Sequence, residues 1–373
     1  MQRRTRLIAA ALAATTTLGL MPTAPAIAAV PPAQVLTFTS AGQLSTSEQF
    51  GPPGATPIVG DFNTHDGQDI VWYTPGAGGD AFWSANGDGS WSSSPLSVSG
   101  SYRPYVGQFT GSDKADDILW YSTTGASQLW DYDLDDEPTL IKTTLPAVTG
   151  TGTILVGDFT TDGATDVIRY RPGAQAEQWW DLNPVADGAA PSITARTFSV
   201  GGTFTPVLGG FATNGQDDGD DVIWYAAGSA ADSLWDFGTD GSITKTPLTI
   251  NGTFRPVVER WLPNAADDVL WYAPGAAADS LWDFRPDGSI QKQALTINGT
   301  YTPYICSCVD TGLNDREDIV WHGVGNAADA VWTLTGSTFA PVSHSYPGTS
   351  IRGSTLTPVR LGDGSDHALI AYG

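Results

Sequence analysis

The chain contains the pentapeptide Asp221-Val222-Ile223-Trp224-Tyr225, in which an aspartate precedes two aliphatic and two aromatic residues. Close copies of this motif recur at intervals of 47 to 55 residues. The aspartates that open the copies are Asp69, Asp117, Asp166, Asp221, Asp268, Asp318 and Asp366. A period near fifty with several short strands per unit is typical of β-propeller blades. The seven copies therefore predict seven blades.

Each repeat has the pattern of four strands separated by turns. In the first repeat we expect strands over residues 57–62, 70–74, 81–85 and 91–98. Runs rich in glycine, asparagine and aspartate separate these apolar segments, as is usual for hairpin turns. Helical periodicity is absent after residue 30. The chain is therefore expected to be all-β.

The two ends of the repeat array complement each other. Residues 35–38 resemble a third strand, whereas the chain stops after a second strand at residues 371–372. The prediction is a single seven-bladed β-propeller of four-stranded blades over residues 30–373, closed by N- and C-terminal strands that share one blade. Such closure removes open sheet edges. Blades should start near residues 57, 104, 154, 206, 256, 303 and 358, and residues 35–50 should complete the last.

Residues 1–29 have the pattern of a cleaved signal peptide. Arg3, Arg4 and Arg6 precede an apolar stretch over residues 7–20, and small residues near position 28 suit cleavage. The alternative is a membrane anchor, but threonines at positions 15–17 interrupt the apolar run. The mature protein is therefore expected to be secreted and extracellular, while its export route, Sec or twin-arginine, stays open.

The composition excludes some classes of partner. Lys and Arg number 17 against 40 Asp and Glu, which gives a net charge of −23. Such a chain is not suited to coating nucleic acid or an anionic membrane. No second apolar stretch is long enough to span a bilayer. With 41% hydrophobic residues the chain can build a core, and we expect a monomer.

The mature chain has two cysteines, Cys306 and Cys308, separated by one residue. On a strand they would point to opposite faces, which makes an unstrained disulfide between them awkward. The sequence leaves their state open.

Most tryptophans recur at two fixed positions of the repeat, where packing of blade against blade is the simplest explanation. Trp91, Trp179 and Trp261 fall outside this repeat and are the better candidates for ligand contact.

The loop after the first strand of the third repeat carries a candidate cation site. Oxygen ligands stand at alternate positions, namely Asp158, Thr160, Asp162, the carbonyl of Ala164, and Asp166. Gly163 would let the loop turn around a hard cation, so the pattern predicts Ca²⁺ here. The alternative is a set of Asx turns in an acidic loop.

A second loop has a related pattern. Asp61, Asn63 and Asp69 keep the same overall span, but the central acid and glycine are displaced by one position. We expect one or two Ca²⁺ sites in total, and Asx turns in the remaining loops.

The motifs Gly60-Asp61-Phe62-Asn63 and Gly157-Asp158-Phe159 with Asp162-Gly163 resemble the FG-GAP, or VCBS-type, repeat of integrin α-subunit propellers and related secreted bacterial proteins. The resemblance covers essentially the whole mature chain. It implies a seven-bladed ring, loop-bound calcium and a role in recognition, and fungal lectins with this type of repeat place sugars between blades. Most of the seven loops depart from the family pattern.

Several acids stand three residues before a third-strand tryptophan, where a carboxylate could bind a sugar hydroxyl beside the ring. These acids are Asp80, Asp232, Asp279 and Asp329. The alternative is that they only solvate a turn.

The sequence lacks a non-repeated catalytic constellation: its four histidines are scattered, and no GxSxG elbow is present. We therefore predict a non-catalytic, lectin-like protein that binds an extracellular glycan through blade loops stabilised by calcium. The alternatives are a protein–protein adhesion module that binds a cell-surface protein, and a polysaccharide lyase or hydrolase built on the propeller.

Overall fold

The computed structural model describes residues 33–38, 44–46, 51–63, 67–76, 78–88, 90–111, 115–133, 139–173, 175–185, 189–211, 219–308, 317–323, 328–334, 339–346, 354–361 and 366–372. The predicted signal peptide lies outside these residues, as do positions 64–66 of the candidate cation loop 61–69. The described residues include no helix with the length and hydropathy needed to cross a membrane.

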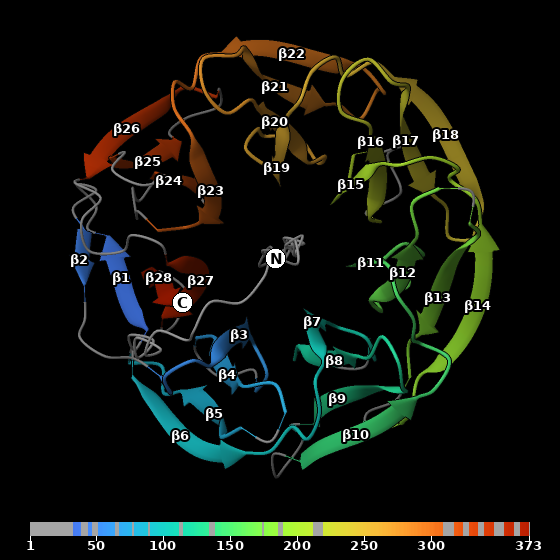
Figure 1. The fold of residues 1–373 in the computed structure, drawn as a ribbon, viewed down its shortest axis with the longest axis vertical. Helices are drawn as coiled ribbons and strands as arrows, with labels where there is room; N and C mark the ends of the chain where they lie inside the picture. The colour runs from blue at the N-terminus through green and yellow to red at the C-terminus, as the bar shows by residue number, and fades with distance from the viewer. Residues whose placement is uncertain are drawn as a thin grey trace, which may run out of the picture.

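Seven antiparallel four-stranded sheets form a ring (Figure 1). Blade 1 contains β3 (Thr56–Gly60), β4 (Asp69–Tyr73), β5 (Asp80–Ala85) and β6 (Trp91–Leu96). Blade 2 contains β7 (Arg103–Gly107), β8 (Asp117–Tyr121), β9 (Ser127–Asp133) and β10 (Thr139–Leu145). Blade 3 contains β11 (Thr153–Gly157), β12 (Asp166–Tyr170), β13 (Glu177–Asn183) and β14 (Ser192–Phe198). Blade 4 contains β15 (Thr205–Gly209), β16 (Asp221–Tyr225), β17 (Asp232–Phe237) and β18 (Ile243–Leu248).

The remaining blades follow the same plan. Blade 5 contains β19 (Arg255–Glu259), β20 (Asp268–Tyr272), β21 (Asp279–Phe284) and β22 (Ile290–Leu295). Blade 6 contains β23 (Tyr301–Cys306), β24 (Asp318–Gly323), β25 (Asp329–Leu334) and β26 (Pro341–Tyr346). Blade 7 contains β27 (Thr355–Leu361), β28 (Asp366–Tyr372), β1 (Gln34–Phe38) and β2 (Leu44–Thr46).

Blade 7 closes the ring with strands from both ends of the chain. Its strand order is β2-β1-β28-β27, and β1 pairs with β28 so that Gln34 lies opposite Ala371 and Thr37 opposite Ala368. The predicted all-β, seven-bladed propeller with a shared terminal blade is therefore confirmed.

Burial changes with distance from the centre of the ring. The first strand of each blade lies innermost and the fourth lies at the rim (Figure 1). The second strands β4, β8, β16 and β20 are buried at every position, because each is covered by neighbouring blades on both faces. The rim strands β18 and β22 are exposed at their four central positions. This gradient explains why the apolar second strand carries the most regular motif.

Aromatic side chains join consecutive blades. The ring of Tyr225 in blade 4 lies 5.1 Å from that of Trp271 in blade 5, and Trp271 in turn lies 5.7 Å from Trp282 of its own blade. The same contact joins Tyr73 with Trp120, Tyr170 with Trp224 and Tyr272 with Trp321. Tilted and edge-on ring pairs at such distances add to the burial energy. The packing explanation for the repeated tryptophans is confirmed.

The same tyrosines hold the crossover to the next blade. The Tyr225 hydroxyl donates to the carbonyl of Gly252 at 2.8 Å and accepts from the backbone N–H of Phe254 at 2.8 Å. Gly228 and Gly252 exchange two backbone hydrogen bonds beside it, and both have positive φ, +99° and +146°. We call this arrangement the tyrosine latch; equivalent contacts of the hydroxyl group involve Tyr73, Tyr170 and Tyr272.

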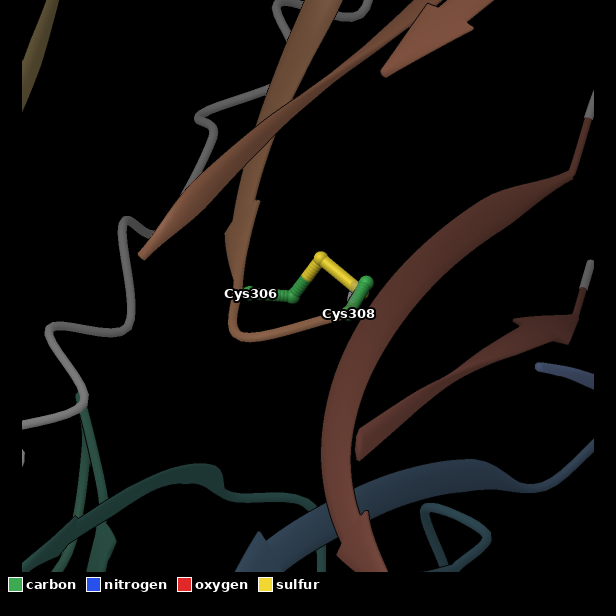
Figure 2. Close-up of a disulfide and its surroundings, with 2 residues drawn as sticks. All are labelled: Cys306 and Cys308. Atoms are coloured by element: carbon green, nitrogen blue, oxygen red, sulfur yellow. A yellow bond between two sulfur atoms is a disulfide. The ribbon is translucent and has the colours of Figure 1, made fainter. Parts of the chain in front are cut away.

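Cys306 and Cys308 form a disulfide (Figure 2), with their Cα atoms 5.1 Å apart. The sequence left the state of these cysteines open, because on a strand they would point to opposite faces. Cys306 is the last residue of β23, so Cys308 lies beyond the strand and the alternation of side chains no longer applies. Both cysteines are buried with Val320 and Leu369, at the junction of blades 6 and 7.

Candidate functional site

The aspartate that opens each second strand anchors the loop before it. Asp166 is fully buried; its Oδ2 accepts from the N–H of Phe159 at 3.2 Å and its Oδ1 accepts from the N–H of Leu182 at 2.8 Å. Burial raises the pKa of Asp166 to about 8; the hydrogen bond from Leu182 opposes this shift, and nearby carboxylates, Asp181 first, add to it. Burial likewise raises the pKa of Asp69 and that of Asp268 to about 7. In the blades that show these contacts, the repeated aspartate therefore has a structural role: its carboxylate fixes the loop before the second strand.

The loop from Asp158 to Asp166 is closed by its own acids. Asp158 accepts from the N–H of Asp162 at 3.2 Å and from that of Gly163 at 3.0 Å, and Asp162 accepts from the N–H of Ala164 at 2.9 Å. Thr160 is buried, and its hydroxyl lies 3.5 Å from Asp166. The Asx turns expected as the alternative to calcium are therefore present.

The backbone of this loop turns at the glycine that the calcium prediction singled out. Gly163 follows the third ligand position with φ +92°, the left-handed turn that a loop of alternating oxygen ligands requires. Thr161 has φ +57° and is the non-glycine residue with positive φ among the described residues. Within the part of the chain that the structure describes, no three acidic, histidine or cysteine side chains converge as metal ligands, because these carboxylates face backbone N–H groups.

A further acid lies beside this loop. Asp181 in β13 is buried and close enough to Asp166 to raise its pKa, and it forms a 3.0 Å ion pair with Arg196. Sequence reasoning did not select Asp181, because it treated the loop in isolation. The signal was available: a Trp-Asp pair recurs in the third strands at Asp131, Asp181, Asp236 and Asp283.

The other predicted loop is held in a different way. Asn63 donates from its side-chain amide to Asp69 at 3.1 Å and to the Ser84 hydroxyl at 2.6 Å. The N–H of Asp61 is bound by Asp116 of the next blade at 2.8 Å. Asn63 thus acts as a hydrogen-bond donor to the very carboxylate with which it was expected to share a cation.

The acids that open the third strands are buried and bonded to backbone. Asp232 accepts from the N–H of Ala226 at 2.8 Å and from that of Ile250 at 2.8 Å. Corresponding pairs of contacts are made by Asp80, with Thr74 and Val98, and by Asp279, with Ala273 and Ile297. Asp329 accepts from the N–H of Gly323 and faces the ring of His322 at 3.0 Å. These carboxylates tie turns and crossovers together and are not placed to meet a sugar at the surface.

Two of the three irregular tryptophans lie in the interior. Trp179 is 1% exposed and packs edge-on against Phe159 and Phe237, whereas Trp261 is 0% exposed and packs against Phe339. Both fill space between blades, so their irregular position in the repeat reflects local packing and not ligand contact.

Trp91, by contrast, is half-buried on the outer part of blade 1. Strand register places Ala85 opposite Trp91 and Ser93 opposite Trp83, so the two tryptophans share one face of the blade. The Trp91 indole N–H donates to the carbonyl of Gln68 at 3.2 Å, which fixes the ring. Trp83 is also half-buried.

The accessibility of Trp83 has a clear cause. In blade 4 the equivalent Trp235 is 4% exposed, because Lys245 lies over its ring at 3.6 Å. Lys142 covers Trp130 and Lys292 covers Trp282 in the same way. In blade 1 a serine, Ser93, stands at the position that lysine holds in those blades, and Trp83 is less buried than Trp235. We call Trp83 and Trp91 the blade 1 aromatic surface.

No protein-family model matches the chain, and no curated protein matches it in sequence. Among solved structures, a chain of the Photorhabdus luminescens Tc holotoxin pore matches with a TM-score of 0.42 and 14% sequence identity. The match covers 91% of the present chain and 16% of that chain. A likeness at this level says nothing about activity or partners. The propeller fold is shown by the blades themselves, and the FG-GAP type of the repeat stays a prediction.

Proposed function

We propose that this protein is a secreted, non-catalytic recognition module that binds carbohydrate at the blade 1 aromatic surface. The observation that supports it best is the pair of half-buried tryptophans on one face, in a blade that lacks the lysine cover of blades 2, 4 and 5. An indole face binds the apolar face of a sugar ring, and fixed aromatic rings supply contact area at low entropic cost.

The turn next to these rings supplies hydrogen-bonding groups. The Ser92 hydroxyl donates to Asn86 at 2.8 Å, and the Ser90 hydroxyl lies between Asn86 and Asp88. These side chains are exposed, so they can exchange their mutual contacts for sugar hydroxyls. Side chains alternate along β6, so Ser92 lies on the face of the blade opposite to Trp91, and these groups would contact only a ligand that extends around the end of the hairpin.

Substitution of the covering residue tests the proposal without removing a tryptophan. The Ser93→Lys change should cover Trp83 as Lys245 covers Trp235, and should reduce affinity for oligosaccharides that bind the native protein on a glycan array by about tenfold or more. Trp91→Ala should have an effect of similar size. Isothermal titration with the best-binding array oligosaccharide measures both changes.

The matched control is Ser343→Lys, which adds the same lysine opposite Trp332 in blade 6. Equal losses from both lysine variants would mean that blade 1 is not the binding surface. Silence of the native protein on all sugars, together with capture of a defined cell-surface protein, would replace this proposal with the adhesion alternative.

The second part of the proposal is that Ca²⁺ stabilises the loop from Asp158 to Asp166. Asp158, Thr160, Asp162, Asp166 and the carbonyl of Ala164 would hold the ion, which would neutralise the loop carboxylates and hold the turn in place. The left-handed Gly163 and the alternating oxygen donors support this assignment. Loop 61–69 carries a weaker version of the same proposal through Asp61, Asn63 and Asp69.

Thermal unfolding with and without Ca²⁺ tests this part. Because a ligand that binds only the folded state stabilises it, about 10 mM CaCl₂ should raise the melting temperature relative to EDTA. Asp162→Asn should abolish most of that increase. Asp287→Asn, which removes an exposed Asx-turn acid far along the chain, should leave it intact. An unchanged melting temperature in the native protein would remove calcium from the proposal.

A further inference from the structure

Blade 3 departs from the repeat at two positions that touch each other. Arg169 occupies the second-strand position that is tryptophan in blades 1, 2, 4, 5 and 6. Gly152 occupies the position where an aromatic ring precedes the first strand of blades 2, 4, 5 and 6; these rings belong to Tyr102, Phe204, Phe254 and Tyr301. In blade 5 that pair is in contact, with Phe254 and Trp271 6.0 Å apart. Blade 3 thus has an arginine and a glycine where other blades have an edge-on aromatic pair.

The glycines around Arg169 leave room for its side chain. A Cβ atom on Gly152 would lie 2.9 Å from Cγ of Arg169, and a Cβ atom on Gly150 would overlap its Nη1. Both glycines have positive φ, +156° and +116°. The guanidinium lies 5.4 Å from the ring of Trp180 and donates from Nη1 to the carbonyl of Thr149.

Blade 2 presents a second arginine to the same place. Arg103, the first residue of β7, is exposed and lies opposite Tyr121 in the ladder. Its Nη1 is 3.4 Å from the carbonyl of Gly152, which is a long contact. Tyr121 is buried and donates to the carbonyl of Gly150 at 2.8 Å. Burial raises the pKa of Tyr121, and both Arg169 and Arg103 lower it, so the two guanidinium groups lie near one phenol.

The arginines at this junction make no ion pair with the described residues. Among the residues that the structure describes, no carboxylate lies within ion-pair distance of Arg103, Arg169 or the nearby Arg171. The buried Nε atoms of Arg169 and Arg171 have no hydrogen-bond acceptor. Glu177 is the nearby acid: burial raises its pKa, Arg171 and Arg169 lower it, and it accepts from the N–H of Arg171. Three arginines therefore gather at one junction of a chain with only 17 basic residues.

We propose that Arg169 and Arg103, at the junction of blades 2 and 3, bind the carboxylate of an acidic sugar. Guanidinium groups match the planar geometry of a carboxylate, and a charge-assisted hydrogen bond is about twice as strong as a neutral one. The net charge of −23 repels a long polyanion, but screening confines that repulsion to about 8 Å at physiological salt. The ligand is therefore a single uronate at the end of an otherwise neutral glycan.

The choice of a sugar as carrier of the carboxylate rests on the proposed function, whereas the carboxylate preference rests on the arginines. The probes are an oligosaccharide ending in glucuronate and the same compound with that carboxyl group methyl-esterified. Titration calorimetry of the full chain should show the acid binding about tenfold more tightly than the ester, because only the acid makes charge-assisted contacts.

The test variant removes the guanidinium and keeps Gly152, because Gly152 has φ +156° and a Cβ atom there would lie 2.6 Å from the carbonyl oxygen of Tyr170. Arg169→Gln should therefore fold and lose the preference for the acid. Arg103→Gln should reduce that preference. Arg255→Gln is the control, because Arg255 holds the same strand position in blade 5 and donates to Tyr301, but faces no counterpart of Arg169.

The outcomes separate the two proposals. Equal affinity for acid and ester, or a preference that survives Arg169→Gln, overturns the carboxylate site even when neutral oligosaccharides bind blade 1. Retained preference for the acid with no binding of neutral oligosaccharides supports the carboxylate site and removes the blade 1 proposal. Binding of a peptide C-terminal carboxylate that depends on Arg169, without binding of the glucuronate compound, overturns the assignment to sugars.

Discussion

Individual aspartate carboxylates stabilise this fold, because each one accepts hydrogen bonds from segments that are distant in the sequence. Asp232 illustrates the arrangement: it bonds Ala226, six residues before it, and Ile250, eighteen residues after it. The side chain is 3% exposed, so neither backbone N–H group has water as a replacement partner. The carboxylate therefore determines how the turn and the crossover of blade 4 meet.

Asp232→Ala should lower the free energy of unfolding by about 1–3 kcal/mol for each buried N–H group that loses its acceptor. Urea denaturation followed by circular dichroism measures the change. The control is Asp240→Ala, which removes an exposed turn acid and should alter stability by no more than about 0.5 kcal/mol. If Asp232→Ala lowers the free energy of unfolding no more than the control does, the Asp232 carboxylate does not stabilise the fold.

At the scale of the residue, recurrence in the sequence identified the important aspartates but not their partners. The motif shows that Asp80 and Asp279 belong to one class, and the structure shows why: each carboxylate receives two backbone N–H groups. Those donors are backbone N–H groups, which every residue except proline carries, so no side-chain pattern reveals them. Trp179 and Trp261 were misjudged for a related reason, because irregular spacing along the chain does not measure burial in a ring of packed blades.

At the scale of the element, the tyrosine latch is the connection that repeats most regularly. Its hydroxyl satisfies one carbonyl and one N–H group at the crossover between blades. The hydroxyl thus fixes the angle at which the chain enters the next blade, while the ring packs on the tryptophan of that blade. Backbone polar groups at such a corner have few other partners.

Tyr225→Phe keeps the ring contact with Trp271 and removes only the hydroxyl. We expect a loss of about 1–3 kcal/mol in unfolding free energy, because the N–H of Phe254 loses its acceptor. Hydrogen exchange measured by mass spectrometry should show faster exchange at residues 252–255 than in the native protein, with other crossovers unchanged. Uniformly faster exchange around the ring would mean that the hydroxyl acts on global stability and not on this corner.

Strand positions were predictable at this scale for a physical reason. A second strand covered on both faces must be apolar throughout, so the Asp-apolar-apolar-Trp-Tyr run marks β4, β8, β16 and β20 directly. The rim strands are exposed and less regular, and the lysines that cover tryptophans there became visible only through strand register. The disulfide was missed because the end of β23 falls between its two cysteines.

At the scale of the whole molecule, the junctions between blades are similar but not equivalent. At four junctions the first residue after an inner strand donates its backbone N–H to a side chain of the next blade. The donors and acceptors are Asp61 and Asp116, Gln108 and Thr165, Asp158 and Asp220, and Gly210 and Asp267. The inner strand ends in glycine in those blades. A Cβ atom on Gly157 would lie 2.7 Å from the carboxylate of Asp220.

The junction of blades 5 and 6 has a different arrangement. The inner strand β19 ends in Glu259, whose own Oε1 accepts from the N–H of Arg260 at 2.8 Å. Glu317, which precedes Asp318 as Asp220 precedes Asp221, is buried. Two carboxyl groups are therefore close enough to interact at this junction, whereas each of the four junctions above has a single acid or threonine beside a glycine.

This junction should make stability depend on pH. Burial, followed by repulsion from Glu317, raises the pKa of Glu259 to about 8, against lowering by Arg260; burial raises the pKa of Glu317 to about 7. Since both folded-state values lie above the value of 4.5 for an ordinary glutamate, the folded protein binds more protons than the unfolded chain between these limits. The stabilisation is complete below about pH 4.5 and is lost as the pH rises through 7 to 8.

We therefore expect the melting temperature, measured by calorimetry in EDTA, to be higher at pH 5 than at pH 8.5. Glu317→Gln removes one ionisable group while keeping its size, so it should raise the melting temperature at pH 8.5 and reduce the difference between the two pH values. Asp287→Asn, which removes an exposed carboxylate, should leave that difference unchanged. A native protein that melts at a higher temperature at pH 8.5 than at pH 5 would contradict this prediction, and an unchanged difference in Glu317→Gln would assign the pH dependence to other buried acids such as Asp166.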